Sequence, residues 1–164
     1  IMKLLETFQS NNNIKKTKKI IVCRGPGSFT ALRIGIAVAI GFRTTLNIPL
    51  YGLTAFDILL QYSRVNYSYE NVYVVIGSSN NQNFYGVLNI KNGFIIKPQK
   101  IHDISKVNKN IENSMLISNI KINNNLYNHL SFVVSIDICE AISSYNLNKL
   151  QEEQGILHPF YISA

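Results

Sequence analysis

Cysteine is scarce in this sequence of 164 residues, which contains only Cys23 and Cys139. Two cysteines are too few for a fold held together by disulfides, and they suit a reducing compartment. The longest apolar run extends from Ile34 to Phe42 between two arginines, and it is shorter than a membrane-spanning helix requires. The opening "IMKLLETFQS" also lacks the basic, apolar and small-residue segments of a signal peptide. We therefore expect a cytoplasmic protein that does not bind membranes.

Acidic residues are few as well: nine Asp and Glu stand against 16 Lys and Arg, which gives a formal net charge of +7. Such a balance is compatible with binding to nucleic acid. The basic residues gather only at 15–19, in a polar stretch without aromatic neighbours. A solvated loop is the preferred interpretation of this cluster, and a nucleic-acid surface is the weaker one.

Alternation of β-branched and amphipathic stretches predicts an α/β protein. Ser28 and Thr54 are suitable caps for two of the helices, and Asn92-Gly93 is a strong hairpin signal. A loose boundary falls near residues 61–70. Strands are expected at 20–23, 47–53, 71–77, 114–118 and, as a hairpin, within 83–98. Helices are expected at 2–9, 28–46, 54–62, 103–111, from a cap at Ser135 or Asp137 to 145, and in a second stretch to 154, before an extended tail at 158–163.

A glycine-rich turn between the first strand and its helix, in "IVCRGPGSFTALRIGIAVAIGF", has the layout of a phosphate-binding loop. A Walker loop needs a lysine after its last glycine, and no lysine follows Gly27 before the helix ends. The dinucleotide fingerprint would use Gly25 and Gly27, but Thr30 occupies its third glycine position. The acidic residue expected about 20 positions later is absent too. Neither nucleotide motif fits.

The helix after this turn is apolar on nearly every face from Phe29 to Phe42, so it must be covered on nearly every face. Ala31, Gly35 and Ala39 recur every four residues and form a ridge of small side chains. A glycine inside a helix costs about 1 kcal/mol relative to alanine, so Gly35 and Gly41 need a compensating reason. The ridge fits two interpretations equally: packing inside this chain, or a helix-to-helix contact with a second subunit.

The stretch "RGPGSFTALRIGIAVAIGF", followed by "NIPLYGLTAFDIL", closely resembles the TsaB (YeaZ) family, whose members carry G-R-G-P-G-S-F-T-G-L-R-I-G. The match is unbroken from Arg24 to Ile36, except that Ala31 replaces a glycine. The tail "PFYIS" is similar to the family's P-x-Y-L-R, with Ser163 in place of arginine. The resemblance implies an actin/Hsp70-like (ASKHA) fold of two ribonuclease-H-like lobes, here 1–64 and 65–164. The first lobe would be truncated, because the family's opening strand I-L-A-I-D-T-S does not precede "IMKLLETF".

The resemblance also implies a function. TsaB proteins are non-catalytic partners of TsaD, which transfers a threonylcarbamoyl group to an adenosine in tRNA. Expected partners are therefore TsaD, TsaE as a further candidate, or a second copy of the chain, with tRNA reached only through the complex. The helix after the glycine turn would be the docking face. The implied interface residues are Phe29, Ala31, Leu32, Arg33, Gly35 and Ala39. The implied structural turn comprises Gly25, Pro26, Gly27, Ser28 and Thr30.

Two departures argue against catalysis by this chain. The metal-binding histidines of the TsaD relative would fall at Ala55 and Leu59, and the three histidines of this chain have no ligand spacing. The family's D-A-R segment is replaced by "SSN" at 78–80. We expect no metal, no cofactor and no enzyme activity. Two alternatives stay open: a degenerate, truncated reading-frame product without activity, and a nucleotide-hydrolysing or metallopeptidase-like enzyme.

Overall fold

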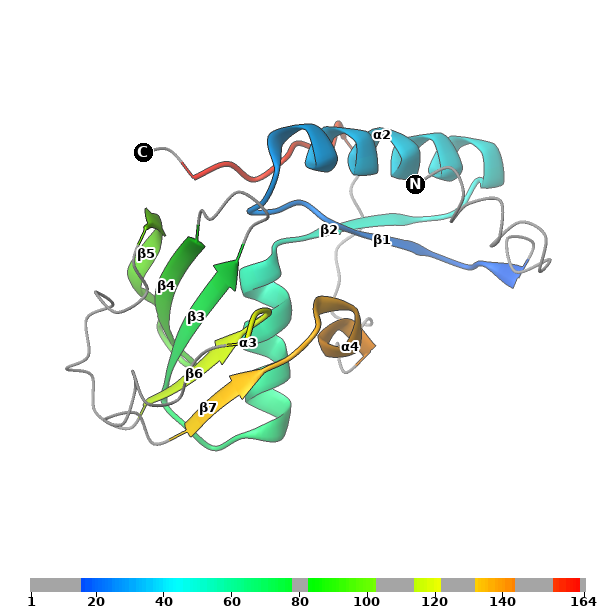
Figure 1. Ribbon diagram of the computed structural model, residues 1–164. Coiled ribbons are helices and arrows are strands. Elements are labelled where there is room, and N and C mark those ends of the chain that lie inside the picture. The colour runs from blue at the N-terminus through cyan, green and yellow to red at the C-terminus, as the bar shows by residue number, and fades with distance from the viewer. Residues whose placement is uncertain (1–15, 78–82, 103–113, 122–131, 144–154, 163–164) are drawn as a thin grey trace.

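A computed structural model describes residues 16–77, 83–102, 114–121, 132–143 and 155–162 of the chain. Their strands form a two-stranded and a five-stranded sheet (Figure 1). The mixture of parallel strands and helices confirms the predicted α/β class. In chain order the elements are β1 (Ile20–Cys23), α2 (Phe29–Leu46), β2 (Leu50–Leu53), α3 (Ala55–Asn66), β3 (Asn71–Gly77), β4 (Asn83–Asn89), β5 (Gly93–Ile101), β6 (Ser114–Ser118), β7 (Phe132–Ser135) and α4 (Ile138–Ser143).

Most predicted elements in these ranges are confirmed, including the helix caps at Ser28 and Thr54. The predicted hairpin is also confirmed: β4 and β5 pair antiparallel, and β5 begins at Gly93. α3 extends four residues beyond the predicted end at Tyr62, to Asn66. The sequence did not predict β7, and Ser135 as a helix cap is wrong because this residue pairs with β6. The helices expected at 2–9, 103–111 and up to 154 lie outside the described residues.

The smaller sheet consists of β1 and β2, which run parallel, with Ile20 opposite Leu50 and Cys23 opposite Leu53. α2 lies along this sheet (Figure 1) and contributes two buried residues, Ile36 and Ala39, to a cluster with Leu50 and Leu157. Leu157 comes from the C-terminal segment, which has neither helix nor strand at 156–162. One face of α2 therefore packs against the smaller sheet and against the C-terminal segment.

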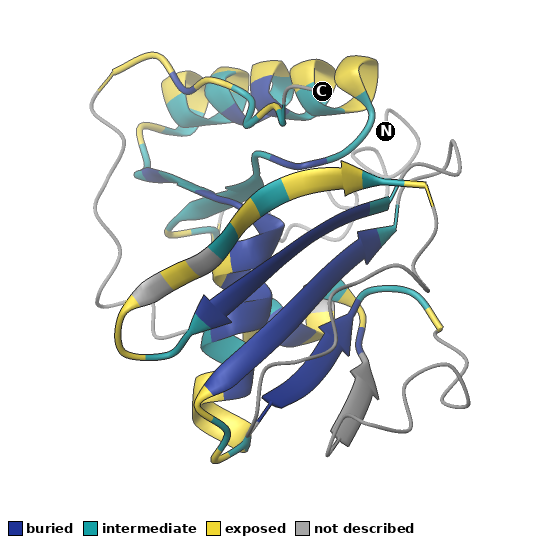
Figure 2. Cartoon of the chain, turned by 90° about the vertical axis from the view of Figure 1, so that its left-hand side faces the viewer, coloured by how far each residue is buried: buried dark blue, intermediate teal, exposed yellow. Residues whose placement is uncertain are grey.

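The larger sheet has the strand order β5-β4-β3-β6-β7. β3 pairs antiparallel with β4 and parallel with β6, and β6 pairs parallel with β7. Its central strands are almost entirely buried (Figure 2). α3 packs against this sheet: Phe56, Ile58 and Leu59 join Val72 and Met115 in the main hydrophobic core. The core therefore joins α3 to strands that follow it in the chain. The division into lobes 1–64 and 65–164 stays a prediction.

α2 differs from the other described helices in length and hydropathy. Over its 18 residues the mean hydropathy is 1.4, and judged by length and composition alone it is the one described helix that could cross a membrane. The apolar run that the sequence delimits at 34–42 is therefore the middle of a longer apolar helix. A core helix of a soluble protein meets the same two criteria, but only a small part of α2 is buried here. Its open surface needs an explanation.

Candidate docking surface

The glycine turn is fixed by close packing against two distant segments. Gly25 has φ of +118°, a conformation that side chains other than glycine rarely adopt. A Cβ at Gly25 would lie 2.8 Å from the Phe160 carbonyl oxygen and 2.9 Å from Leu32 Cδ1. The Gly25 carbonyl oxygen accepts a hydrogen bond of 2.8 Å from the Ala55 amide. Gly25 and the buried Pro26 thus join β1, α3 and the C-terminal segment.

The remaining residues of the predicted turn lead into α2. Gly27 has room for a Cβ, since its nearest contact would be Leu32 at 3.9 Å. Ser28 is the N-cap: its Oγ accepts a long hydrogen bond of 3.5 Å from the Ala31 amide, which satisfies one free amide of the first turn. Thr30 is exposed and already belongs to the helix.

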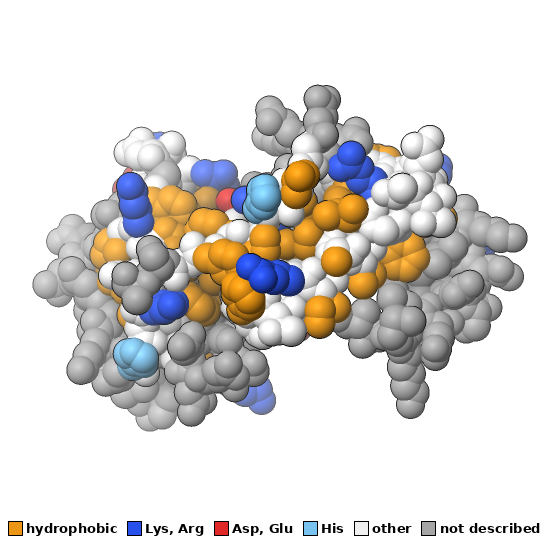
Figure 3. Space-filling view, turned by 90° about the horizontal axis from the view of Figure 1, so that it is seen from above, with side chains coloured by type: hydrophobic (Ala, Val, Ile, Leu, Met, Phe, Trp, Pro, Cys, Tyr) orange, Lys and Arg blue, Asp and Glu red, His pale blue; other side chains and the backbone are white. Residues whose placement is uncertain are grey.

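The outward face of α2 is open (Figure 2), and hydrophobic side chains lie on it beside basic ones (Figure 3). Phe29 is 54% exposed and Ile34 46% exposed, although large apolar residues usually lie inside. The exposed residues Thr30, Ile34, Ala37 and Gly41 follow one another at helical spacing. We call these four residues the outward stripe.

The predicted interface residues are divided between the two sides of α2. Ala31 and Arg33 are exposed, whereas Leu32 and Gly35 are half-buried. Ala39 is only 5% exposed because it packs with Leu50 and Leu157. The ridge predicted from Ala31, Gly35 and Ala39 is therefore not one open surface, and Ala39 is corrected to a core residue of this chain.

Two glycines leave open space along α2. A Cβ placed on Gly35 or on Gly41 would meet no described side chain within 4 Å. Packing against the described part of the chain therefore does not explain why a helix residue should be glycine at either position. Small residues at a helix surface allow a second helix to approach closely, at axis separations of about 8–10 Å.

A cluster of three side chains stands at the beginning of α2: Phe29, Arg33 and Tyr161. The guanidinium carbon of Arg33 lies 3.8 Å from the centre of the Phe29 ring. Arg33 Nε donates a hydrogen bond of 3.2 Å to the Tyr161 hydroxyl. The Phe29 and Tyr161 rings stack with centroids 5.3 Å apart. The sequence singled out Phe29 and Arg33, but Tyr161 was missed because its contact joins residues 128 positions apart.

The charges on α2 are all of one sign. The helix contains Arg33 and Arg43 and no acidic residue, not even in its first turn, where Asp or Glu would be stabilised by the helix dipole. The surface seen from above α2 carries basic side chains and very little acidic surface (Figure 3). In apolar character and charge, this face is complementary to a surface that combines apolar side chains with carboxylates.

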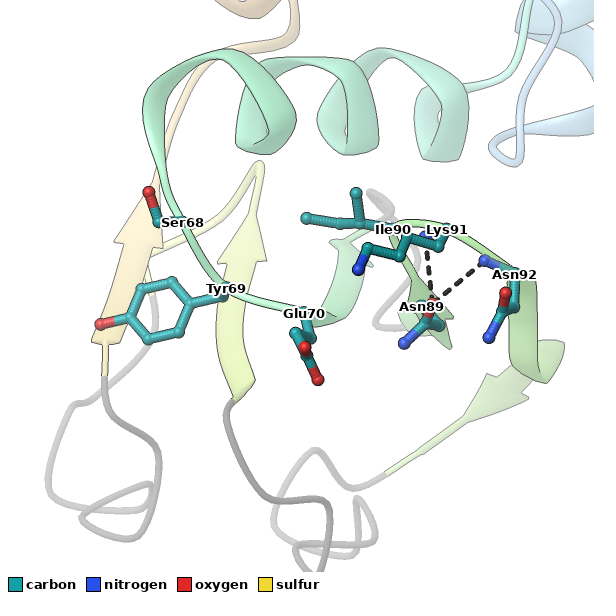
Figure 4. A pocket seen from close by; sticks show the side chains of 7 residues that line it. All are labelled: Ser68, Tyr69, Glu70, Asn89, Ile90, Lys91 and Asn92. Atoms are coloured by element: carbon teal, nitrogen blue, oxygen red, sulfur yellow. Dashed lines mark hydrogen bonds between the residues drawn. The ribbon is translucent and has the colours of Figure 1, made fainter.

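A separate cavity of about 350 Å³ lies beside the turn between β4 and β5, away from α2 (Figure 4). Asn89 shapes this turn: its Oδ1 accepts hydrogen bonds from the Lys91 and Asn92 amides, each 3.0 Å long, and its Nδ2 donates to Asn71 Oδ1. The cavity wall carries the opposite charges of Glu70 and Lys91. None of the lining residues was predicted to belong to a functional site, although Asn92 was predicted as part of the hairpin turn. They are Ser68, Tyr69, Glu70, Asn89, Ile90, Lys91 and Asn92.

The positions that would carry a metal in the TsaD relative do not fit one here. Ala55 and Leu59 are both buried in the main core, and neither offers a donor atom. Across the described ranges, no three His, Cys, Asp or Glu side chains lie close enough to hold a metal ion. At the C-terminal end of α3, partial burial raises the pKa of Tyr67, and the charge and hydrogen bond of Tyr62 raise it further.

Comparison with known sequences places the chain in a family. The family model of TsaD, tRNA N6-adenosine threonylcarbamoyltransferase, matches residues 1–148. The tRNA threonylcarbamoyladenosine biosynthesis protein TsaB of Buchnera aphidicola subsp. Schizaphis graminum (strain Sg) is 28% identical over 102 residues. This match covers 62% of the chain and 48% of the relative, so the chain matches about half the length of that protein.

Solved structures with the same fold come from Pseudomonas aeruginosa. Its YeaZ is 16% identical with a TM-score of 0.59, over 91% of this chain and 76% of that one. An uncharacterized protein with similarity to peptidase YeaZ is 15% identical with a TM-score of 0.57, over 98% of this chain and 81% of that one. These likenesses confirm the actin-like fold class. By its match to the family model over residues 1–148, the chain belongs to the TsaD family, and within its fold it is similar to TsaB and YeaZ.

Proposed function

We propose that the chain is an accessory subunit, and not the catalyst, in the formation of threonylcarbamoyladenosine in tRNA. It acts by binding TsaD through the outward face of α2. The observation that carries this function is an apolar helix that stays open along the outward stripe while its other side is anchored by Ile36 and Ala39. The name of the TsaB relative supports the pathway, and the resemblance of the glycine turn and its helix to the TsaB family supports TsaD as the partner.

The open face has the properties of a protein interface. Contiguous apolar surface rimmed by polar groups marks interaction sites in soluble proteins. On α2 the apolar side chain of Ile34 is accompanied by the small residues Ala37 and Gly41, with Arg33 at the side. A guanidinium beside the stripe favours a protein partner over lipid tails, in which an arginine costs several kcal/mol, roughly 2.5–3.5 by insertion scales.

The test uses Gly41→Ala and Gly41→Leu, on the outward stripe, in the full chain, with affinity for purified TsaD measured by calorimetry. A Cβ at Gly41 meets no described atom of its own chain within 4 Å, and loss of a helix glycine stabilises by about 0.5–1 kcal/mol. Both variants should therefore fold at least as well as the parent chain. We expect alanine to weaken TsaD binding slightly and leucine to weaken it about tenfold or more, because overpacking an interface costs roughly 1–3 kcal/mol.

The matched control is Gln99→Leu, which adds one exposed leucine on β5, in the other sheet. It should bind TsaD as the parent chain does. Unchanged affinity of Gly41→Leu would show that the outward stripe of α2 is not the docking face. Failure of the folded parent chain to bind TsaD at all would refute the accessory role. Turnover of ATP by the purified chain would instead favour the nucleotide-hydrolysing alternative.

A further inference from the structure

The cluster of Phe29, Arg33 and Tyr161 holds one guanidinium group in a fixed orientation on an exposed surface. All three residues are exposed. One face of the guanidinium covers the Phe29 ring at 3.8 Å, and Nε is engaged by the Tyr161 hydroxyl at 3.2 Å. Stacking of Tyr161 on Phe29 in turn fixes the hydroxyl that receives this bond. Arginine normally loses considerable side-chain entropy when it binds, and here part of that ordering precedes binding.

The two terminal nitrogens of Arg33 stay available. Within the described part of the chain, the only hydrogen bond of this side chain is the one from Nε. The four N–H groups on the terminal nitrogens form a planar fork that matches a carboxylate with two parallel hydrogen bonds. α2 has no acidic residue to occupy the fork. A carboxylate that occupies this fork would therefore come from outside α2.

We propose that Phe29, Arg33 and Tyr161 form an anchor site for a single Asp or Glu carboxylate of the partner subunit. Arg33 binds the carboxylate, and the rings of Phe29 and Tyr161 hold Arg33 in place and cover one face of its guanidinium group. The C-terminal segment is thus part of the docking surface, with Tyr161 as a positioning residue. The anchor rests on the proposed function, because its occupant is a side chain of TsaD.

The anchor is a candidate hot spot for physical reasons. Hot spots are enriched in tyrosine and arginine, and neighbouring groups shield them from water. An ion pair between a carboxylate and this oriented guanidinium is stronger than one with a mobile arginine, because the aromatic rings beside it lower the local dielectric constant. Phosphate offers the same acceptor geometry as carboxylate, so tRNA is the competing source. A carboxylate is favoured because the site adjoins the apolar outward stripe and not a continuous basic groove.

The experiment measures binding of TsaD to the full chain and to the variants Arg33→Ala, Arg33→Lys and Tyr161→Phe. Lys97→Ala, on β5 of the other sheet, removes one positive charge as a matched control. We expect Arg33→Ala to weaken binding about 10- to 100-fold and Arg33→Lys nearly as much, since lysine keeps the charge but lacks the fork. Lys97→Ala should leave the affinity unchanged.

Tyr161→Phe keeps the ring and removes only the hydroxyl that receives Nε. It should weaken binding a few-fold in the parent chain and have no effect in the Arg33→Ala background, while the midpoint of urea unfolding stays unchanged. This coupling separates positioning of Arg33 from general support of the fold. Asp and Glu residues of TsaD are then changed one at a time to Asn or Gln. For one of these TsaD variants, the parent chain and Arg33→Ala should bind with equal affinity.

The result that overturns the anchor is parent-like TsaD binding by both Arg33 variants, while the parent chain itself binds. No TsaD binding by the parent chain would instead refute the proposed function. Binding of tRNA to the chain alone is followed by fluorescence anisotropy. If Arg33→Ala weakens tRNA binding and leaves TsaD binding intact, the fork receives phosphate and the carboxylate anchor is wrong.

Discussion

Arg33 Nε lies 3.2 Å from the hydroxyl of Tyr161, a residue 128 positions later in the chain. This contact fastens the end of the chain to the beginning of α2, where the C-terminal segment runs beside the helix (Figure 1). The same segment is held by a 2.8 Å hydrogen bond from the Phe160 amide to the Arg24 carbonyl oxygen. Phe160 packs against the main core, whereas Leu157 packs in the cluster beneath α2. The segment therefore connects the main core with the cluster beneath α2.

Leu157→Ala tests the contribution of this segment to stability. Leu157 is 3% exposed, whereas its neighbour Ile156 is 78% exposed. Truncating a buried leucine costs about 2–5 kcal/mol, and we expect the lower half of this range because the segment has no regular structure that would keep a cavity open. Ile156→Ala is the control and should change the free energy of unfolding by less than about 0.5 kcal/mol. Urea unfolding of the two variants checks the difference; equal stabilities would show that the segment does not secure the fold.

Replacing glycine by alanine should lower the free energy of unfolding in the glycine turn and raise it in α2. Gly25→Ala places a Cβ 2.8 Å from a backbone oxygen in a residue with φ of +118°, so we expect a loss of about 1–3 kcal/mol or more. Gly41→Ala adds a methyl group in open space within a helix, and we expect a gain of up to about 1 kcal/mol. Thermal and urea unfolding of the isolated chain measure both. Destabilisation by Gly41→Ala would mean that another part of the chain already occupies that space.

Local chemistry made much of this site predictable. Ser28, the glycine turn and the apolar helix are neighbours in sequence, so their order alone indicates a strand, a turn and a capped helix. The role of Ala39 could not be predicted in this way, because a helix that is apolar on nearly every face does not reveal which side meets its own sheet. The role of Tyr161 could not be predicted for another reason: its contact with Arg33 depends on how the whole chain folds. β7 was missed because "FVVS" is short and is defined by its pairing with β6.

The N-terminal cap of α3 should contribute more to the free energy of unfolding than a side-chain hydrogen bond elsewhere on a helix does. Thr54 Oγ1 accepts from the Asp57 amide at 3.1 Å, and the Asp57 carboxylate accepts from the Thr54 amide at 3.0 Å, which forms a reciprocal capping box. Thr54→Ala should therefore cost about 1–2 kcal/mol of unfolding free energy. Thr45→Ala is the control. The exposed Thr45 hydroxyl donates to the Gly41 carbonyl oxygen one turn earlier in α2, and this bond caps no free amide. This substitution should be neutral or slightly stabilising. Equal effects in urea unfolding would contradict the importance of the cap.

The last prediction concerns the ionisation of Tyr67. Partial burial raises the pKa of Tyr67 above its ordinary value of 10.0, and the charge and hydrogen bond of Tyr62 raise it further. The folded chain therefore keeps this proton more tightly than the unfolded chain does. Its contribution to stability is complete below pH 10 and is lost as the pH rises through the folded pKa. We expect NMR titration of labelled tyrosine rings to show a high midpoint that Tyr67→Phe removes. Tyr62→Phe should lower that midpoint only in part, because burial of Tyr67 remains, whereas an unshifted midpoint in the parent chain would show that Tyr67 is fully solvated.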